Sequence, residues 1–144
     1  MQKHVAWSSA VGVFSLLAAA NAQVAAPSAA GTPFDGTYRL ASSANVNATY
    51  TSRKGQTAPC PPRRAGPLHI ENGQARYTTA TGIRVRGTVG PQGELALQAM
   101  APSKWANQPI DLSVSGTVDN AGTARVRQLS HSCSYDFMWQ KASR

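Results

Sequence analysis

The chain has 144 residues, of which 42% are hydrophobic and 14% are charged. This length is enough for one hydrophobic core and too short for two. Fourteen Lys and Arg residues against six Asp and Glu residues give a formal net charge of +8, most of it from arginine. Such a balance draws a protein toward anionic surfaces and excludes partners that are themselves strongly basic.

The chain begins MQKHVAWSSAVGVFSLLAAANAQVAA, which has the pattern of a secretory signal peptide. Lys3 and His4 give a short basic start, an uncharged stretch follows, and small residues at 20–22 suit a signal peptidase. The alternative is a membrane-spanning helix, but the apolar run of about 16 residues is shorter than the roughly 20 that a bilayer core requires. We predict a signal peptide at 1–22 that is cleaved after Ala22, a flexible leader at 23–33 and a single domain at 34–144.

Two cysteines, Cys60 and Cys133, lie in the part of the chain that would remain after cleavage. A free catalytic thiol and a metal site are the alternatives to a disulfide. Neither cysteine belongs to a CxxC pair, however, and a metal ion would need two or three further ligands. Because a compartment outside the cytoplasm oxidises such pairs, we predict a disulfide, which closes a loop of some 73 residues and contributes about 4 kcal/mol in the chain-entropy model.

From Phe34 onward the hydrophobic pattern has a period of two, which is typical of β-strands with one buried face. In FDGTYRLA, Tyr38 and Leu40 fall on one side of an extended chain and Arg39 on the other. This alternation predicts nine short strands. Their inward residues are Phe34, Tyr38 and Leu40; Val46, Ala48 and Tyr50; Leu68 and Ile70; Ala75 and Tyr77; Ile83, Val85 and Val89; Leu95, Leu97 and Ala99; Ile110, Leu112, Val114 and Val118; Ala124 and Val126; and Tyr135, Phe137 and Trp139.

Turn signals separate the predicted strands. ENGQ at 71–74, GPQG at 90–93 and DNAG at 119–122 each carry a glycine suited to a left-handed turn position. Gly36, Gly87 and Gly116 lie within strands and indicate bends or bulges. We therefore predict an all-β fold: a small antiparallel meander of about eight or nine strands that closes into a barrel or a two-layer sandwich, with one disulfide. The stretch TAPCPPRRAG at 57–66 is expected to be a long loop between the second and third strands, pinned by its cysteine.

Arginines gather in two places along the sequence. If Tyr77, Ile83 and Val85 face the core, Arg76, Arg84 and Arg86 face solvent on two neighbouring strands, and guanidinium groups so placed suit phosphate, sulfate or carboxylate. The alternative is a solvated face that only keeps the protein soluble. The candidate residues for an anion or a partner are Arg76, Arg84, Arg86, Arg125 and Arg127 on strands, and Arg53, Lys54, Arg63 and Arg64 around the pinned loop.

Signals for catalysis are sparse. LSHSCSYD at 129–136 brings Ser130, His131, Ser132 and Asp136 together in sequence. Catalytic triads are assembled from separate segments, however, and neighbours on a strand point to opposite faces. The sequence also contains neither HExxH nor GxSxG, and it has no closely spaced carboxylate pair. We predict a protein without enzymatic activity, cofactor or metal.

An interior ligand pocket is a further possibility. Several inward positions hold alanine, which would leave room inside a barrel for a small apolar ligand. The alternative, which we favour, is that small and large side chains interdigitate in a filled core. Trp105, on a loop at 98–109 that Pro102 and Pro109 keep from forming a long helix, is expected either to contact a sugar or partner or to fold over a barrel end.

The chain contains the motifs FDGTYRL and LHIENGQARY, two GTV hairpins and the terminal segment CSYDFMWQK. Through these motifs, residues 34–141 resemble small secreted β-rich proteins that are common in proteobacteria. The GTY motif and the aromatic last strand are also similar in style to lipocalin-like and avidin-like barrels. The lipocalin signature G-x-W is missing, because Tyr38 stands at the tryptophan position. The resemblance implies an architecture and supplies no catalytic residues.

These observations predict an exported, non-catalytic binding or envelope-associated module. Loss of Lys3 with the signal peptide leaves thirteen basic against six acidic residues, a net charge of 13 − 6 = +7. The expected partner of the basic outer face is an anionic envelope component or another secreted protein, and the compartment disfavours nucleic acid. The two alternatives are a periplasmic small-molecule carrier with an interior pocket and an inhibitor of a secreted enzyme that is acidic or neutral.

Overall fold

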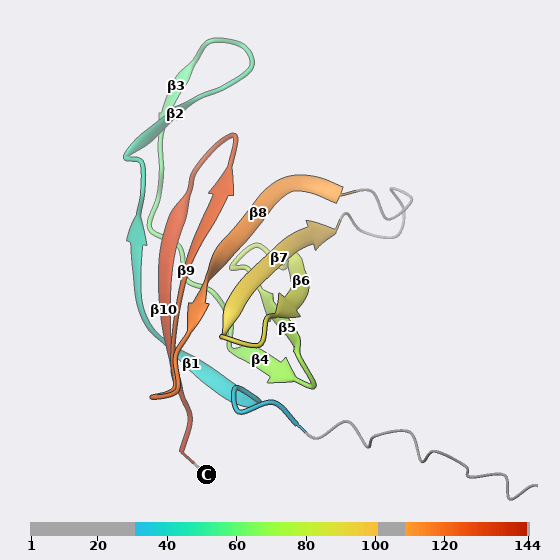
Figure 1. The fold of residues 1–144 in the computed structure, drawn as a ribbon. Helices are drawn as coiled ribbons and strands as arrows, with labels where there is room; N and C mark the ends of the chain where they lie inside the picture. Colours follow the sequence, from blue (N-terminus) through green and yellow to red (C-terminus); the bar gives the residue numbers. More distant parts are fainter. Residues whose placement is uncertain (1–30, 101–108, 144) are drawn as a thin grey trace, which may run out of the picture.

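Eight antiparallel strands close into a barrel in the computed structural model, which describes residues 31–100 and 109–143 (Figure 1). The predicted signal peptide, most of the predicted leader and Trp105 lie outside the described residues. Within the described ranges, no helix is long and apolar enough to cross a membrane. The barrel strands are β1 (Gly36–Asn45), β4 (Leu68–Glu71), β5 (Gln74–Thr78), β6 (Arg84–Val89), β7 (Glu94–Met100), β8 (Pro109–Val118), β9 (Thr123–Ser130) and β10 (Tyr135–Lys141).

Strand β1 closes the barrel because it pairs with two neighbours. Its first residues, Gly36 to Tyr38, pair with β4, and Tyr38 to Asn45 pair with β10. The β1–β10 register shifts between Leu40 and Ser42, and an irregularity of this kind lets a long strand bend from one neighbour to the next. The predicted all-β meander is confirmed, and it is a barrel and not a sandwich.

The barrel interior is packed with the side chains that alternation placed inward. Tyr38, Val85 and Trp139 have no exposed surface, and Tyr77 packs against Trp139 with ring centroids 5.3 Å apart. At the end where β1 begins, Phe34 is buried, and its carbonyl accepts a 2.6 Å hydrogen bond from the Tyr38 hydroxyl. The filled core that the sequence favours is therefore present inside the barrel.

The predicted turns have the expected backbone. Asn72 and Gly73 have φ angles of 51° and 75°, and Gly93 and Gly122 also have positive φ, at 90° and 83°. The prediction for glycines inside strands needs a correction, because the strand register continues through Gly87 without a shift. A Cβ there would lie 1.9 Å from the Ala96 carbonyl oxygen, so this glycine permits close strand approach and does not form a bulge.

The prediction that residues 46–50 form the second strand of the barrel is wrong. Strand β1 extends to Asn45, and the following residues lead into a separate two-stranded sheet of β2 (Thr49–Thr51) and β3 (Thr57–Pro59), which stands beyond one end of the barrel (Figure 1). Val46 is 41% exposed and Tyr50 is half-buried, so neither belongs to the core. Pairing of β1 with β4 and β10 already closes the sheet, which leaves no barrel edge for a further strand.

The predicted disulfide between Cys60 and Cys133 is present, with Cα atoms 5.5 Å apart. Both sulfurs are therefore used, which removes the alternatives of a free thiol and a cysteine metal ligand. Cys133 lies in the connection just before β10, and Cys60 directly follows β3. The predicted pinned loop is thus partly structured: its first three residues form β3, and the remainder runs from the disulfide back to β4.

Candidate functional site

A pocket of about 530 Å³ opens at the end of the barrel where β1 and β9 finish and β10 begins. We call this end the mouth. The lining combines side chains from the top of the core with exposed residues of the connections above it. Its buried residues are Leu112, Gln128, Tyr135 and Phe137, and its exposed residues include Pro59, Pro61, Arg63, Arg64, Asp111 and His131.

Gln128, on β9, is the polar group in the deep part of the pocket. Only 6% of the residue is exposed, and its Oε1 accepts a 2.6 Å hydrogen bond from the Tyr77 hydroxyl. Burial raises the pKa of Tyr77, so the hydroxyl stays protonated and donates. The Gln128 amide nitrogen has no hydrogen-bond partner among the described residues. Gln128 itself lines the pocket, so this amide can donate a hydrogen bond to a ligand there.

Aromatic side chains and the chain around the disulfide form the wall of the pocket. Tyr135 and Phe137 stack at 5.9 Å with an angle of 18° between their rings. The Tyr135 hydroxyl donates to the Pro61 carbonyl at 3.0 Å, close to the Cys60–Cys133 bridge. The wall is therefore held by a covalent bond and a hydrogen bond, which keeps the connection from β3 beside the mouth.

Asn47 adds a third link at the mouth, one that the sequence analysis did not identify. Its amide nitrogen donates to the Ser132 carbonyl at 3.1 Å, and its carbonyl oxygen accepts from the Ser134 amide at 2.8 Å. An amide that bonds both a donor and an acceptor fixes the chain after β1 against the connection that leads into β10. The sequence around Asn47 contains no signal for these two hydrogen bonds, because the partner residues lie 85 and 87 positions away along the chain.

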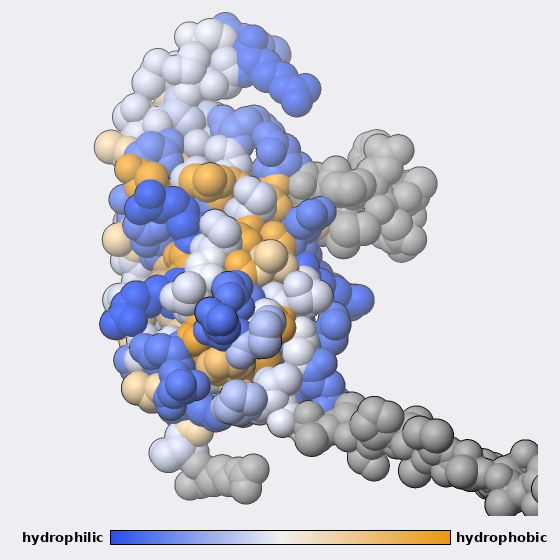
Figure 2. Space-filling model, in the orientation of Figure 1, coloured by the Kyte–Doolittle hydropathy of each residue, from blue (hydrophilic) through white to orange (hydrophobic). Residues whose placement is uncertain are grey.

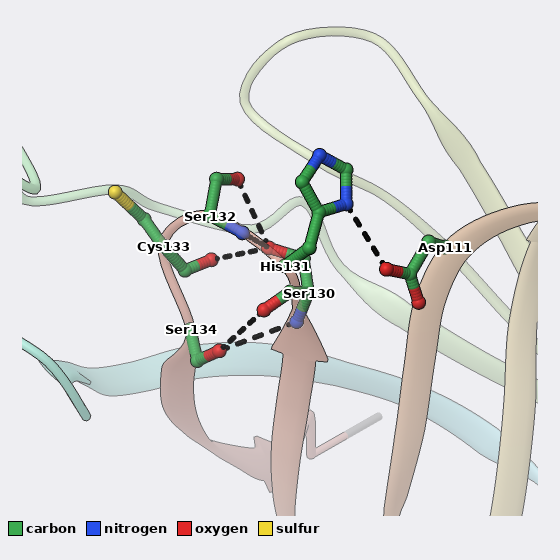
Figure 3. Close-up of polar contacts among 6 residues, drawn as sticks. All are labelled: Asp111, Ser130, His131, Ser132, Cys133 and Ser134. Carbon is green, nitrogen blue, oxygen red and sulfur yellow. Dashed lines mark hydrogen bonds and ion pairs between the residues drawn. The ribbon is translucent and has the colours of Figure 1, made fainter. Parts of the chain in front are cut away.

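His131 and Asp111 meet at the exposed edge of the mouth. The His131 Nδ1 lies 3.0 Å from Asp111 Oδ2, and the imidazole points toward β8 (Figure 3). Ser130 instead bonds Ser132 at 3.1 Å and the Cys133 carbonyl at 2.9 Å. In this described stretch no serine hydroxyl hydrogen-bonds the imidazole. The structure does not join these serines, His131 and Asp136 into a triad.

A second, smaller depression of about 300 Å³ lies on the outside of the barrel over β4, β5 and β6. It is lined by His69 and by the three predicted arginines of this region, Arg76, Arg84 and Arg86, all of which are exposed. Arg76 and Arg86 are direct cross-strand partners. Arg76 has an ion pair with Glu71 at 3.5 Å, whereas Arg84 and Arg86 have no acidic partner within the described ranges.

Arg125 and Arg127, on β9, are also exposed but lie apart from that depression, because β7 and β8 separate their strand from β6. Each has an acidic partner. Arg125 lies 3.7 Å from Asp119, and Arg127 forms two 2.8 Å hydrogen bonds with Asp136. The hydrogen bonds from Arg127 lower the pKa of Asp136. Both of these arginines, which were predicted as anion-binding candidates, are thus already paired with carboxylates of the same chain.

The predicted basic cluster around the pinned loop is divided by the structure. Arg63 and Arg64 line the mouth pocket, on the connection between β3 and β4. Arg53 and Lys54 lie instead in the turn between β2 and β3 and do not line the pocket. The surface of this hairpin is hydrophilic toward its tip (Figure 2). The structure therefore leaves two basic residues at the mouth and two at the hairpin tip.

The sequence matches no known protein-family model, and no curated protein or solved structure is significantly similar to it. The resemblance to small secreted β-rich proteins therefore stays a prediction. Function has to be inferred from the two sites themselves, namely the mouth pocket and the depression over β4–β6.

Proposed function

We propose that this chain is an exported, non-catalytic binding protein that carries a small ligand in the mouth of its barrel. The observation that carries the proposal is the pocket of about 530 Å³ whose lining includes the Gln128 amide, a donor with no hydrogen-bond partner among the described residues. Ligand sites typically measure about 300 to 1,000 Å³ and combine apolar walls with a few polar groups that fix orientation. The mouth has this composition, with Gln128 as the deepest polar group.

Packing limits where a ligand can lie. Below the pocket, Trp139 and Tyr38 are fully buried and fill the barrel. A ligand would therefore rest on Phe137 and Leu112 at the top of the core and would not pass down the barrel axis. This arrangement supports a carrier whose ligand is small and partly accessible from solvent.

Native mass spectrometry of protein purified from its own host tests the proposal. We expect a mature chain that begins at Gln23 and carries an additional mass that denaturation removes. The control is Ile83→Trp, which places a large ring at a half-buried position of the pocket lining. This variant should fold and arrive without the additional mass. A wild-type protein that arrives ligand-free and takes up no small molecule from host extract would contradict the proposal.

The depression over β4–β6 favours a second candidate function, attachment to an anionic envelope component. Three exposed arginines and His69 surround it, and two of the arginines have no acidic partner within the described residues. Planar guanidinium groups suit phosphate and carboxylate oxygens. This candidate is compatible with the first, because the two sites share no lining residue.

Retention on host envelope fractions tests this second candidate. Changing Arg76, Arg84 and Arg86 to Gln should weaken retention and flatten its salt dependence, because three positive charges leave the contact. The matched control changes Arg39, Arg53 and Lys54 to Gln, which removes the same charge from exposed positions elsewhere. Equal retention of the two variants would show that net charge, and not this depression, determines the interaction.

A further inference from the structure

We propose that the ligand of the mouth is an amphipathic organic anion, whose apolar body lies on Tyr135 and Phe137 and whose acidic group lies near Arg63 and Arg64. This inference rests on the proposed carrier function and names its ligand class. It follows from three properties of the pocket: the apolar surface at its base, the free amide donor and the charge balance of its lining.

The apolar surface favours a flat or chain-like hydrocarbon body. The stacked rings of Tyr135 and Phe137 and the side chain of Leu112 form the buried part of the lining, and half-buried Ile83 adds to it nearer the edge. Apolar atoms that move from water onto these groups gain about 25 cal/mol per Å² of buried surface. A small, wholly hydrophilic solute would leave this surface without an apolar partner.

The amide donor favours a ligand that carries oxygen acceptors. Tyr77 already satisfies the Oε1 of Gln128, and the amide nitrogen of this pocket-lining residue has no hydrogen-bond partner among the described residues. Gln128 is 94% buried, since 6% of it is exposed, and a ligand that covered this donor without pairing with it would leave the donor buried and unpaired, which is costly. A pure hydrocarbon could not pair with it, whereas an oxygen of an acid or of a carbonyl could.

The charge balance favours an anion. The side chains with ionisable charge in the pocket lining are Arg63, Arg64, Asp111 and His131. The two guanidinium groups outnumber the single carboxylate, Asp111, which lies 3.0 Å from the His131 imidazole. Arg63 and Arg64 have no ion-pair partner within the described part of the chain, so their charge is available to a ligand. Guanidinium groups form strong, often paired hydrogen bonds with carboxylates and sulfonates.

A matched pair of fluorescent probes tests the inference with the full mature protein. Anilinonaphthalene sulfonate is an amphipathic anion, and phenylnaphthylamine is the same ring system without the sulfonate. We expect the wild-type protein to bind the sulfonate more tightly than the neutral probe. Changing Arg63 and Arg64 together to Gln should weaken sulfonate binding about fivefold to tenfold. The effect is limited to this range because both arginines are exposed to solvent, which weakens a contact between charges. Binding of the neutral probe should change less than about twofold.

Two charge-matched controls locate the effect. Changing Arg53 and Lys54 to Gln removes two charges from the hairpin tip, and changing Arg84 and Arg86 to Gln removes two from the outer depression. Both variants should keep wild-type affinity for both probes. If the Arg84 and Arg86 variant alone loses sulfonate affinity, the anion binds the outside of the barrel and the inference is overturned.

The variant Ile83→Trp separates failure of the inference from failure of the carrier function. If this variant loses both probes while the Arg63 and Arg64 variant binds them as the wild type does, the mouth holds ligands but does not select anions. If the wild-type protein binds neither probe, the carrier function fails along with the inference. Unchanged thermal unfolding of each variant confirms that the barrel is intact.

Discussion

The hydrogen bond between Tyr77 and Gln128 links the barrel core to the mouth, and its energetics can be measured directly. Changing Tyr77 to Phe leaves Gln128 Oε1 buried without a donor, which should cost about 1–3 kcal/mol of unfolding free energy. Changing Gln128 to Leu should cost a similar amount. The double variant should lose less than the sum, because both polar groups are then gone. Urea unfolding of the four proteins measures this coupling, and strictly additive losses would refute it.

The ion pair of Arg127 with Asp136 makes stability depend on pH. Because the guanidinium lowers the pKa of Asp136 in the folded state, its contribution is present above the unfolded pKa and is lost as pH falls through the folded pKa. Asp136→Asn should therefore lower the melting temperature slightly at neutral pH and by less at about pH 2, which is below the ordinary aspartate pKa of about 3.9. The pair is half exposed, so added salt should reduce the difference. An equal difference at both pH values would contradict this assignment.

Side-chain direction could be predicted from sequence, whereas side-chain partners could not. Alternation placed Arg76, Arg86 and Arg127 outside, and all three are exposed. Which acid each arginine meets depends on strand register, as in the direct pairing of Arg127 with Asp136 across β9 and β10. The strand register is set jointly by the turn lengths and by the bulge in β1. Neither the arginine–carboxylate pairs nor the contacts of Asn47 therefore follow from the local sequence pattern.

The β2–β3 hairpin shows where the periodic pattern misleads at the scale of elements. Val46, Ala48 and Tyr50 alternate as core residues do, yet they lead into or form a hairpin outside the barrel. Conversely, the second half of β1 is exposed on both faces, so its extended pairing with β10 carries no hydrophobic signal. A period of two identifies extended chain with one apolar side but does not identify the strand with which it pairs.

The disulfide should stabilise both the barrel and its mouth. Replacing Cys60 and Cys133 by Ser opens a 73-residue loop and should cost about 4 kcal/mol in the chain-entropy model. The connection at Pro61 then depends on the Tyr135 hydrogen bond, so binding of the neutral probe should weaken as well. Guanidinium unfolding and probe titration measure the two effects. An unchanged unfolding midpoint would show that the bridge does not constrain the chain.

Two turn glycines, Gly93 between β6 and β7 and Gly55 between β2 and β3, have a similar backbone but different surroundings. Gly93 has a φ of 90°, and a Cβ there would lie 2.0 Å from the Val118 carbonyl oxygen. Gly55, in the hairpin turn, has a φ of 74° and nothing within 4 Å. Gly55→Ala should cost about 1 kcal/mol from backbone strain alone, and Gly93→Ala should cost clearly more. Equal losses of stability in thermal unfolding would mean that the close approach of Gly93 to the Val118 carbonyl does not affect stability.

Across the whole molecule, the two ends of the barrel differ. Phe34 is buried at the end where β1 starts. The other end bears the β2–β3 hairpin (Figure 1), and the disulfide and the pocket also lie there. The sequence predicted one all-β domain with a bridge between its cysteines, but it left barrel and sandwich open. Closure depends on the two partners of β1, which lie far apart along the chain, and the pocket in turn depends on closure.

The most direct measurement is an NMR titration of the mature protein with anilinonaphthalene sulfonate, followed through the backbone amide signals. If the mouth binds the ligand, shifts should concentrate at Ile83, Ser130 and Tyr135. The signals of Gly73 and Gly122, in turns at the opposite end, should stay unchanged. Shifts centred on those turns, or on the depression over β4–β6, would contradict a ligand site at the mouth.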